Sequence, residues 1–596
     1  MANGNYDAIV IGTGFGATIA ATRLALKGKK TLMMERGTWW VTPETLGKPP
    51  VPAKKPLPQY AAENNEPVQY WPRPDHKEGL IDLLAAFRSD LNKEGLYQYS
   101  IFKQIHILTA SGVGGGSLIY SNVTLRPEDE VLQGLGLNLG DAEYQAAVAW
   151  MEDYRGKLNK VVTKIPLPGR DVANLGQDDY LLLDRSRALR DAAAKVSGDL
   201  GIQIPWKPLD LAIIEYTEDA NRKSSADGAK THTNCERQGR CIFGCLPAAR
   251  YTLNKTIYNR LLLDPNSGVT LLPLVKVLYI TKTQNGYNVR YEDRRDGGKH
   301  KSIEAPQVFL GAGTLGSTEI LLRSRDDHDF PLNDRLGSQF STNGDFAGFA
   351  VNTANSVFSA RGPINTSHIH AKLDGLHVAI EDCAIPAMTA PIASAALQVL
   401  DNAAQADSFI GKLKLAFQFK LLPDLGNLFP TIPNTKDPNA FKTEAEMVQN
   451  TFFFNSMGQD DASGKIFLDH DQIQVDWDAD RPIADHPVFQ KIESLQKAIA
   501  EAMGGRYVSS PLWKGLANRK LICVHPLGGC PIGQDNSKGV VDEFGRVFDG
   551  SKPPGSTDTL PGLYVVDGAA IPGALVANPS LTISAQAIKT VTKALP

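Results

Sequence analysis

The first forty residues alternate short apolar runs with one helical stretch. Residues 6–12 (YDAIVIG) form a continuous apolar run of the length that buried parallel strands have. A helix is predicted from about Phe15 to Lys27, and TLMME predicts a second strand that ends at Glu35. A strand, a helix and a second strand in this order indicate a right-handed βαβ unit.

Further periodic segments follow in the middle of the chain. The pattern predicts a helix over 179–200 and strands over 269–280 and 287–291. Residues 307–313 (QVFLGAG) predict another strand, which runs into a second glycine turn. No internal repeat or low-complexity tract interrupts these segments.

Two long segments do not fit this pattern. Residues 43–74 hold nine prolines, which exclude helix and central strand and favour an extended path over the surface. This segment is a linker or a flap over a binding cleft, and the flap is favoured because long structureless loops are uncommon without a function. Residues 392–421 are apolar helical stretches between prolines, which belong to the core or line an apolar substrate entrance.

Composition narrows the classes of protein that fit. A chain of 596 residues suits two domains, and a net charge of −3 without a basic cluster argues against nucleic acid as a partner. The N-terminus shows no secretion signal, and no apolar run reaches the roughly 18–20 residues of a membrane span. A cytoplasmic location is therefore expected. Six cysteines in a chain of this length do not form a disulfide framework.

The glycines after the first strand provide a candidate site. Gly12, Gly14 and Gly16 have the spacing of a dinucleotide-binding turn, in which bare backbone lets a pyrophosphate approach the N–H groups of the following helix. Glu35 ends the second strand about 20 residues later, where an acidic side chain binds ribose hydroxyls. The pattern predicts a dinucleotide site, and by itself it does not distinguish NAD from FAD.

Three later segments resemble the glucose–methanol–choline (GMC) oxidoreductases and, among them, the cholesterol-oxidase-like branch. The first is SGVGGGS at 111–117, followed by LIYSNV, and the second is VFLGAGTLGSTEILLRSR at 308–325. The third comprises HPLGGC at 525–530, GVVDEFGRVFDG at 539–550 and LYVVDGAAIPGALVANPSLTISAQAI at 563–588. The resemblance reaches both ends and the middle of the chain, so it covers the fold as a whole.

The resemblance implies an α/β fold with a Rossmann-like FAD-binding domain made of residues 1–44, 232–328 and 538–596. Residues 45–231 and 329–537 would form a discontinuous substrate domain on a mostly antiparallel sheet. FAD is expected to bind noncovalently, because His106 lies several residues too early for the histidine link of some relatives. The positions that match FAD contacts in the family are Gly12, Gly14, Phe15, Gly16, Glu35, Gly114, Gly115, Gly116, Asn122, Val277, Asp567 and Gly568.

Three residues match the groups that perform chemistry in this family. His525 of HPLGGC and Asn578 of ANPS match the pair that faces the flavin, where an imidazole can accept a hydroxyl proton and an amide can orient the substrate oxygen. Glu381 in HVAIEDCAIPA resembles the glutamate base of cholesterol oxidases, which moves a proton during double-bond isomerisation. Two alternatives are that Glu381 and Asp382 form a solvated acidic pair, or that the base falls one position away.

The function implied by the resemblance is oxidation of a small-molecule alcohol by hydride transfer to the flavin, with a bulky apolar alcohol such as a sterol as substrate. The electrons would pass to O2 or another acceptor, and peripheral contact with a membrane would give access to an apolar substrate. Two alternatives stay open. One is a dehydrogenase that passes electrons to an iron–sulfur cluster, a quinone or a cytochrome, and the other is a flavin lyase or photoenzyme without net oxidation.

The cysteines at 235, 241 and 245 form a separate candidate site. Thiolates spaced C-x5-C-x3-C on one loop suit an iron–sulfur cluster, and some FAD sugar dehydrogenases that resemble this chain carry a three-iron cluster at this spacing. The cholesterol-oxidase-like proteins have a fourth cysteine, near whose place Arg237 and Gln238 stand here. The alternative is that Cys235, Cys241 and Cys245 are free thiols of the core.

Overall fold

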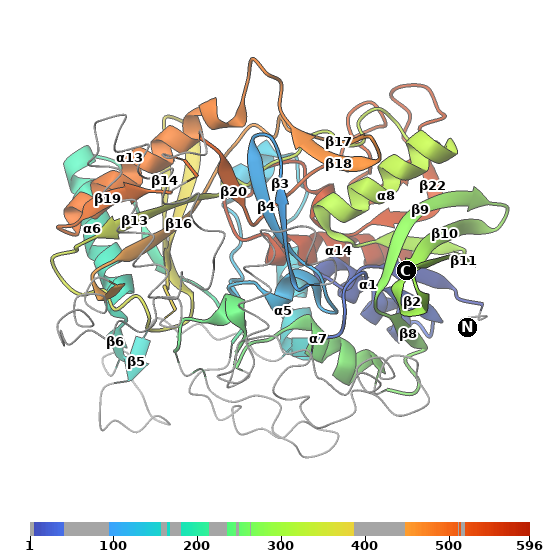
Figure 1. The fold of residues 1–596 in the computed structure, drawn as a ribbon, viewed down its shortest axis with the longest axis horizontal. Coiled ribbons are helices and arrows are strands. Elements are labelled where there is room, and N and C mark those ends of the chain that lie inside the picture. Colours follow the sequence, from blue (N-terminus) through green and yellow to red (C-terminus); the bar gives the residue numbers. More distant parts are fainter. Residues whose placement is uncertain are drawn as a thin grey trace.

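The computed structural model describes residues 5–40, 95–155, 164–166, 180–213, 235, 237–245, 249–262, 264–386, 448–510, 512–513 and 519–596. These residues form two six-stranded sheets, with a small three-stranded sheet between them (Figure 1). The proline-rich segment 43–74 and the apolar segment 392–421 lie outside the described residues. Within the described part of the chain, no helix has the length and apolar character needed to cross a membrane.

The first sheet contains the predicted N-terminal βαβ unit, which is confirmed. Its strand order is β21, β22, β12, β1, β2, β8, and all its described pairings are parallel except that of β21. The bounds are β1 Ala8–Ile11, β2 Thr31–Met34, β8 Val269–Leu272, β12 Gln307–Leu310, β21 Arg546–Phe548 and β22 Thr559–Val565. Such a sheet, buried on both faces, is the Rossmann-like arrangement expected from the sequence.

Helices cover this sheet closely. Helices α1 (Phe15–Leu26) and α14 (Ser580–Ala594) share one apolar cluster with Val10 and Phe309 of the sheet. A Cβ at Gly16 would lie 1.5 Å from the carbonyl oxygen of Val566, just beyond β22. Helix α1 can approach the sheet this closely only because residue 16 carries no side chain.

The prediction of one continuous strand over 269–280 is wrong. The chain turns at Leu274, which has a φ of +57°, and continues as β9 (Val275–Thr283) in a separate antiparallel sheet. That sheet is completed by β10 (Gly286–Asp293) and β11 (Lys299–Ala305). Because Val275 N donates to the carbonyl oxygen of Glu35 at 2.9 Å, β9 begins beside the acidic end of β2.

The second six-stranded sheet is antiparallel, with the order β19, β13, β16, β15, β14, β7. Helices α6 (Asp184–Leu200) and α13 (Pro487–Ala502) cover one face, since Ser186 binds Asp382 and Gln496 binds Ser456. The residues next to Asp382 and Ser456 along their strands therefore point to the opposite face. The bounds are β7 Trp206–Pro208, β13 Phe346–Val351, β14 Asn365–Leu373, β15 Leu376–Cys383, β16 Phe452–Gly458 and β19 Arg506–Ser509.

The helix predicted over 179–200 begins later than expected. Tyr180–Leu182 forms a short strand, β6, paired with β5 (Lys164–Pro166), and α6 starts at Asp184. The residues of β6 are three consecutive large side chains, YLL. The helical alternation of apolar and polar positions begins only after them.

The small central sheet connects the two larger ones. It consists of β3 (Tyr97–Ile101), β4 (Ile105–Ala110) and β20 (Leu521–Cys523). Strands β4 and β20 are parallel, with Cys523 opposite Ile107. Since parallel strands end at the same edge of a sheet, the glycine run after β4 and His525 after β20 leave this sheet side by side.

Candidate active site

The two glycine turns at the ends of β1 and β12 contact each other. Gly12 has a φ of +93°, and a Cβ there would lie 2.2 Å from the carbonyl oxygen of Gly311. Helix α1 begins at Phe15 without a side-chain cap and without an acidic residue in its first turn, so its N–H groups can receive an anion. The Phe15 ring packs edge-on against Tyr120, with centroids 5.6 Å apart, which joins this turn to the glycine run.

Glu35 is buried at the end of β2 and is bound on both carboxylate oxygens. Thr13 Oγ1 donates to its Oε2 at 2.6 Å, and Gly37 N donates to its Oε1 at 2.9 Å. Thr13 Oγ1 also accepts from Gly114 N at 3.0 Å, so the acid and both glycine segments form one network. Burial raises the pKa of Glu35. Thr13 was missed in the sequence, although its place inside the glycine turn was a usable signal.

A buried arginine holds the segment that follows the glycine run. Arg250 Nε donates to Asn122 Oδ1 at 2.9 Å, and its other nitrogens donate to the backbone oxygens of Ser117, Leu118 and Tyr120. Asn122 is fully buried with a φ of +66°, and its Nδ2 has no hydrogen-bond partner within the described residues. A buried amide N–H group without a partner can donate a hydrogen bond to an acceptor atom of a bound ligand.

Asp567 organises the second glycine turn at the start of α8 (Gly313–His328). Its Oδ2 accepts from Gly313 N at 2.8 Å and from Ser317 Oγ at 2.6 Å, and its Oδ1 accepts from Ala569 N at 2.9 Å. Burial raises the pKa of Asp567. A Cβ at Gly568 would lie 3.0 Å from Thr314 Oγ1, so residues 567 and 568 both lie against this turn.

These features fit FAD as the dinucleotide. The pyrophosphate would lie at Gly12, Gly14, Gly16 and the N–H groups of α1, and Glu35 would receive ribose hydroxyls. Val277 lies on β9 two residues after Val275, whose N–H donates to the carbonyl oxygen of Glu35, and its backbone would provide the expected contact to adenine. The glycine run 114–116 and the free amide of Asn122 would lie against the ring system.

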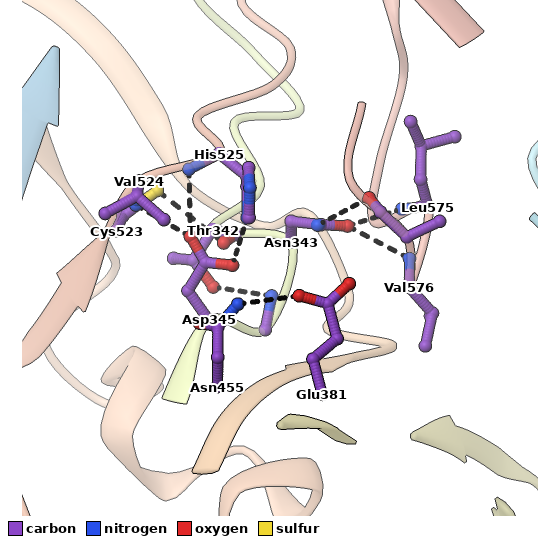
Figure 2. A network of polar contacts seen from close by, with 12 residues as sticks. Thr342, Asn343, Asp345, Glu381, Asn455, Cys523, Val524, His525, Leu575 and Val576 are labelled. Atoms are coloured by element: carbon purple, nitrogen blue, oxygen red, sulfur yellow. Dashed lines mark hydrogen bonds and ion pairs between the residues drawn. The ribbon is translucent and has the colours of Figure 1, made fainter. Parts of the chain in front are cut away.

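The second sheet contributes a carboxyl group on the face opposite its two helices. Glu381 on β15 is completely buried, and its Oε2 accepts from Asn365 Nδ2 at 2.6 Å and from Asn455 Nδ2 at 2.9 Å (Figure 2). Burial raises the pKa of Glu381 to about 7, although the His525 charge and the amides of Asn455 and Asn578 lower it. A carboxyl group with this pKa can take up and release a proton near neutrality.

The neighbouring acid, Asp382, points to the helix-covered face. Its Oδ1 accepts from the backbone N–H groups of Thr366 and Ser367, at 2.7 and 2.9 Å. Its Oδ2 accepts from Ser186 Oγ at 2.9 Å and lies 3.4 Å from Arg185 Nε. The alternative of a solvated acidic pair is wrong, because both carboxyl groups are fully buried on opposite faces of the strand.

His525 is held by a buried aspartate that the sequence reasoning missed. Its Nδ1 lies 2.8 Å from Asp345 Oδ1, while Asp345 Oδ2 accepts from the backbone N–H groups of Val524 and His525 at 2.7 and 2.9 Å. Burial lowers the pKa of His525, but the charge and hydrogen bond of Asp345 and the charge of Glu381 raise it above its usual value. One contact to the ring and two to the backbone thus fix the position of His525, as Figure 2 shows.

Asn578 is positioned through the loop that precedes it. Asn343 Oδ1 accepts from Leu575 N at 2.8 Å and Val576 N at 3.0 Å, and Asn343 Nδ2 donates to the carbonyl oxygen of Ala577 at 3.1 Å. Val576 has a φ of +55°, which is strained for a β-branched residue and is fixed by these contacts. Asn578 itself is buried, and its Oδ1 has no hydrogen-bond partner among the described residues.

The structure brings the three predicted side chains together. The charge of His525 and the amide of Asn578 both act on Glu381, which requires them to lie near its carboxyl group. The supporting residues Asp345, Asn343, Asn365 and Asn455 were missed. The available signals were polar residues within apolar surroundings, namely TNGD at 342–345 and the asparagine in FFFNS at 452–456.

Glu381→Gln is expected to stabilise the protein at about pH 8 and to change little at about pH 4. The unfolded carboxyl has a pKa of about 4.3, so its folded value of about 7 means that folding favours the protonated acid. The stabilisation of the folded protein by protonated Glu381 is complete below the unfolded pKa and is lost as the pH rises through about 7. Linkage puts the loss on the order of 2–4 kcal/mol, which a neutral glutamine avoids. Thermal unfolding at both pH values measures it, and an equal change at both would contradict the prediction.

The candidate iron–sulfur site has no support in the structure. The three cysteines line one small pocket, with Cys235 Sγ accepting from Arg237 N at 3.4 Å and Cys245 Sγ accepting from Ala249 N at 3.2 Å. Burial raises the pKa of Cys245, which favours its neutral thiol. Among the residues with described positions, no three His, Cys, Asp or Glu side chains are grouped so that they could hold a metal ion.

Comparison with known proteins identifies relatives over the whole length. The sequence is 25% identical to a cholesterol oxidase of Mycobacterium tuberculosis, over 98% of this chain and 90% of the relative. It is 22% identical to a long-chain-alcohol oxidase of Arabidopsis thaliana, over 98% of this chain and 66% of the relative. The fold is similar to that of pyridoxine 4-oxidase from Mesorbium loti, with a TM-score of 0.53 at 15% identity over 99% of both chains.

Two family matches include the residues described above. The N-terminal region of the GMC oxidoreductases matches residues 6–329, which is more than half of the 596 residues, and the C-terminal region matches residues 513–587. The first match contains both glycine turns and Glu35, and the second contains His525, Asp567 and Asn578. The chain therefore belongs to the GMC oxidoreductase family and is an FAD-dependent oxidoreductase that acts on alcohol groups.

Proposed function

We propose that His525 accepts the hydroxyl proton of the alcohol. The observation that carries this role is the Asp345–His525 pair, in which the carboxylate binds Nδ1. In the tautomer that donates from Nδ1 to Asp345, Nε2 presents its lone pair to the substrate. The raised pKa of His525 favours proton uptake there. FAD, when bound, supplies the acceptor for the hydride that leaves the carbinol carbon.

Asn578 and Glu381 complete the proposed site. The free Oδ1 of Asn578 is an acceptor, which suits it to orient the alcohol through the hydroxyl hydrogen, and Asn343 keeps its loop in place. Glu381 and His525 influence each other's pKa, so the proton taken from the alcohol can be shared between the two groups. Because the pKa of Glu381 is about 7, its protonated and ionised forms are both populated near neutral pH.

The substrate that we propose is a bulky apolar alcohol, with sterols as the first class. Two points support it: the cholesterol oxidase among the relatives, and the buried Glu381, which matches a base that acts in sterol isomerisation. Long-chain primary alcohols are the second class, favoured by the plant relative. O2 is the proposed electron acceptor, since both relatives are named oxidases, and a peripheral membrane contact would supply either substrate.

The two sheets support a proposed division into domains. All six strands of the parallel sheet come from residues 1–44, 232–328 and 538–596, the proposed FAD-binding domain. All six strands of the antiparallel sheet come from residues 45–231 and 329–537, the proposed substrate domain. Glu381 therefore comes from the substrate domain, whereas Asn578 comes from the FAD-binding domain.

Anaerobic mixing of the FAD-loaded enzyme with single alcohols tests the substrate class. A 3β-hydroxysterol is expected to bleach the flavin absorbance rapidly, and a long-chain primary alcohol is expected to do so more slowly. Admitting air should restore the yellow colour if O2 is the acceptor. Faster bleaching by the primary alcohol would make long-chain alcohols, not sterols, the preferred substrate class. No bleaching by any alcohol would favour a flavin lyase.

A further inference from the structure

A cavity of about 620 Å³ lies against the same face of the antiparallel sheet as Glu381. His368 and His370 of β14 line it, together with Ala379 of β15 and Val576 of the loop before Asn578. Ala379 lies two residues from Glu381 on the same strand, and residues at this spacing share a face. The cavity therefore comes within two residues of the buried acid along β15.

His368 is the cavity-lining residue directly beside Glu381. The register of β14 and β15 places His368 opposite Glu381, and His370 opposite Ala379. On its other side Glu381 is opposite Asn455 of β16. Directly opposed residues of antiparallel strands point to one face with Cβ atoms about 4.5–5.5 Å apart. Glu381 thus has an amide on one side and an imidazole on the other.

Each of the two side chains has one buried atom without a hydrogen bond in the described structure. These atoms are Oε1 of Glu381 and Nδ1 of His368. Figure 2 shows the second carboxylate oxygen of Glu381 pointing away from Asn455, with no contact drawn to it. Buried polar atoms normally have a partner, so these two atoms, on directly opposed residues, are available to a bridging water.

His368 has the protonation state that proton transfer requires. The pKa of His368 is lowered to about 4, mainly by burial and also by the charges of Lys207 on β7 and His370 on β14, while Asp382 on β15 raises it. The ring is therefore neutral at physiological pH. A neutral imidazole can accept a proton at one nitrogen while it releases another from the second nitrogen.

We propose that Glu381 exchanges its proton with the water of this cavity through His368. The inference rests on the proposed function, in which each alcohol oxidised releases one hydride to the cofactor and one proton to the His525–Glu381 pair. Glu381 is completely buried, so this proton needs a route. It passes from Oε1 through one bridging water to Nδ1 of His368, as Nε2 releases its own proton to the cavity. His368 is a positioning residue, because it acts through Glu381.

The experiment follows flavin bleaching and proton release together in one anaerobic turnover. FAD-loaded enzyme is mixed with the alcohol that bleaches it, in weak buffer with a pH-indicator dye. The two signals are expected to coincide in the unmodified protein. In His368→Ala and His368→Gln, proton release is expected to fall behind bleaching by about tenfold, and added imidazole is expected to restore it in His368→Ala.

His370→Gln is the matched control, because it changes a histidine of the same strand and cavity that lies opposite Ala379. Its two signals should stay together. Coincident signals in both His368 variants, or an equal delay in His370→Gln, would overturn the relay. Absence of bleaching in the unmodified protein would instead overturn the proposed function. Because Gln keeps a side chain of similar size, a folding defect in His368→Ala leaves the test intact.

Discussion

His525→Gln is expected to slow anaerobic flavin reduction by a factor on the order of 10²–10⁴, the usual contribution of a general base. Glutamine can still accept or donate a hydrogen bond, but it cannot take up the hydroxyl proton. The yellow flavin spectrum of the purified variant should be unchanged, because the side chain lies outside the network of Thr13, Glu35 and Gly114. Stopped-flow absorbance with saturating alcohol measures the rate constant directly.

Asp345→Asn should give a loss of similar size for a different reason. Two backbone N–H groups bind Oδ2, so they are expected to hold the amide oxygen of asparagine at that place. The amide nitrogen would then donate to Nδ1 of His525 and leave the proton on Nε2, which cannot accept another. The lost negative charge also lowers the pKa of His525, so the acidic limb of the pH–rate profile should move to lower pH. A reduction rate within about threefold of the original in both variants would remove His525 from the proton-accepting role.

Asp382→Ala is expected to lower the free energy of unfolding by about 3–5 kcal/mol. Asp382 and Arg185 are both within 1% of complete burial, and their ion pair measures 3.4 Å. Removing the carboxylate leaves a buried guanidinium without its counter-charge and two backbone N–H groups of β14 without their acceptor. Urea unfolding of the FAD-loaded protein, followed by tryptophan fluorescence, measures the change.

The adjacent acid provides the control for this prediction. Glu381→Gln affects the same strand, one residue away, yet it is expected to stabilise the protein above neutral pH. Opposite signs for neighbouring carboxyl groups would show that the two faces of β15 have different roles. A loss below about 1 kcal/mol in Asp382→Ala, as for an exposed ion pair, would contradict the structural role of Asp382.

The parallel sheet was predictable to a large extent because its signals are local. Residues 6–35 contain an apolar run, a glycine turn, a helix and a second apolar run, which became β1, α1 and β2. The break at Leu274 was not predictable from apolar pattern, since its residues are as apolar as those of the strands beside it. The turn depends on backbone bonds to Gly37 and Glu35, more than 200 residues earlier in the chain.

The antiparallel sheet was expected only through the family resemblance. Strands β14 and β15 form a local hairpin, with Leu373 opposite Leu376. Other strands pair across long separations, as β13 pairs with β16 and β19, and pairing of this kind leaves no periodic signal in a single sequence. The same holds for the site. His525 and Asn578 stood in motifs, but Asp345 lies 180 residues from His525, and Asn343 lies 232 residues from Leu575. Only the folded chain shows that these residues meet.

The parallel pairing of β4 and β20 has a consequence for how such an enzyme can change its substrate. The glycine run that would face the flavin and the histidine that would take the proton are attached to one rigid strand pair. The distance between cofactor and proton acceptor is therefore set by this strand pair and by the contacts of Asp345, and it is insensitive to replacements away from them. Segments that shape the remainder of the pocket can vary in length and composition without disturbing that distance. An enzyme built in this way can acquire a new alcohol while it retains the same chemistry.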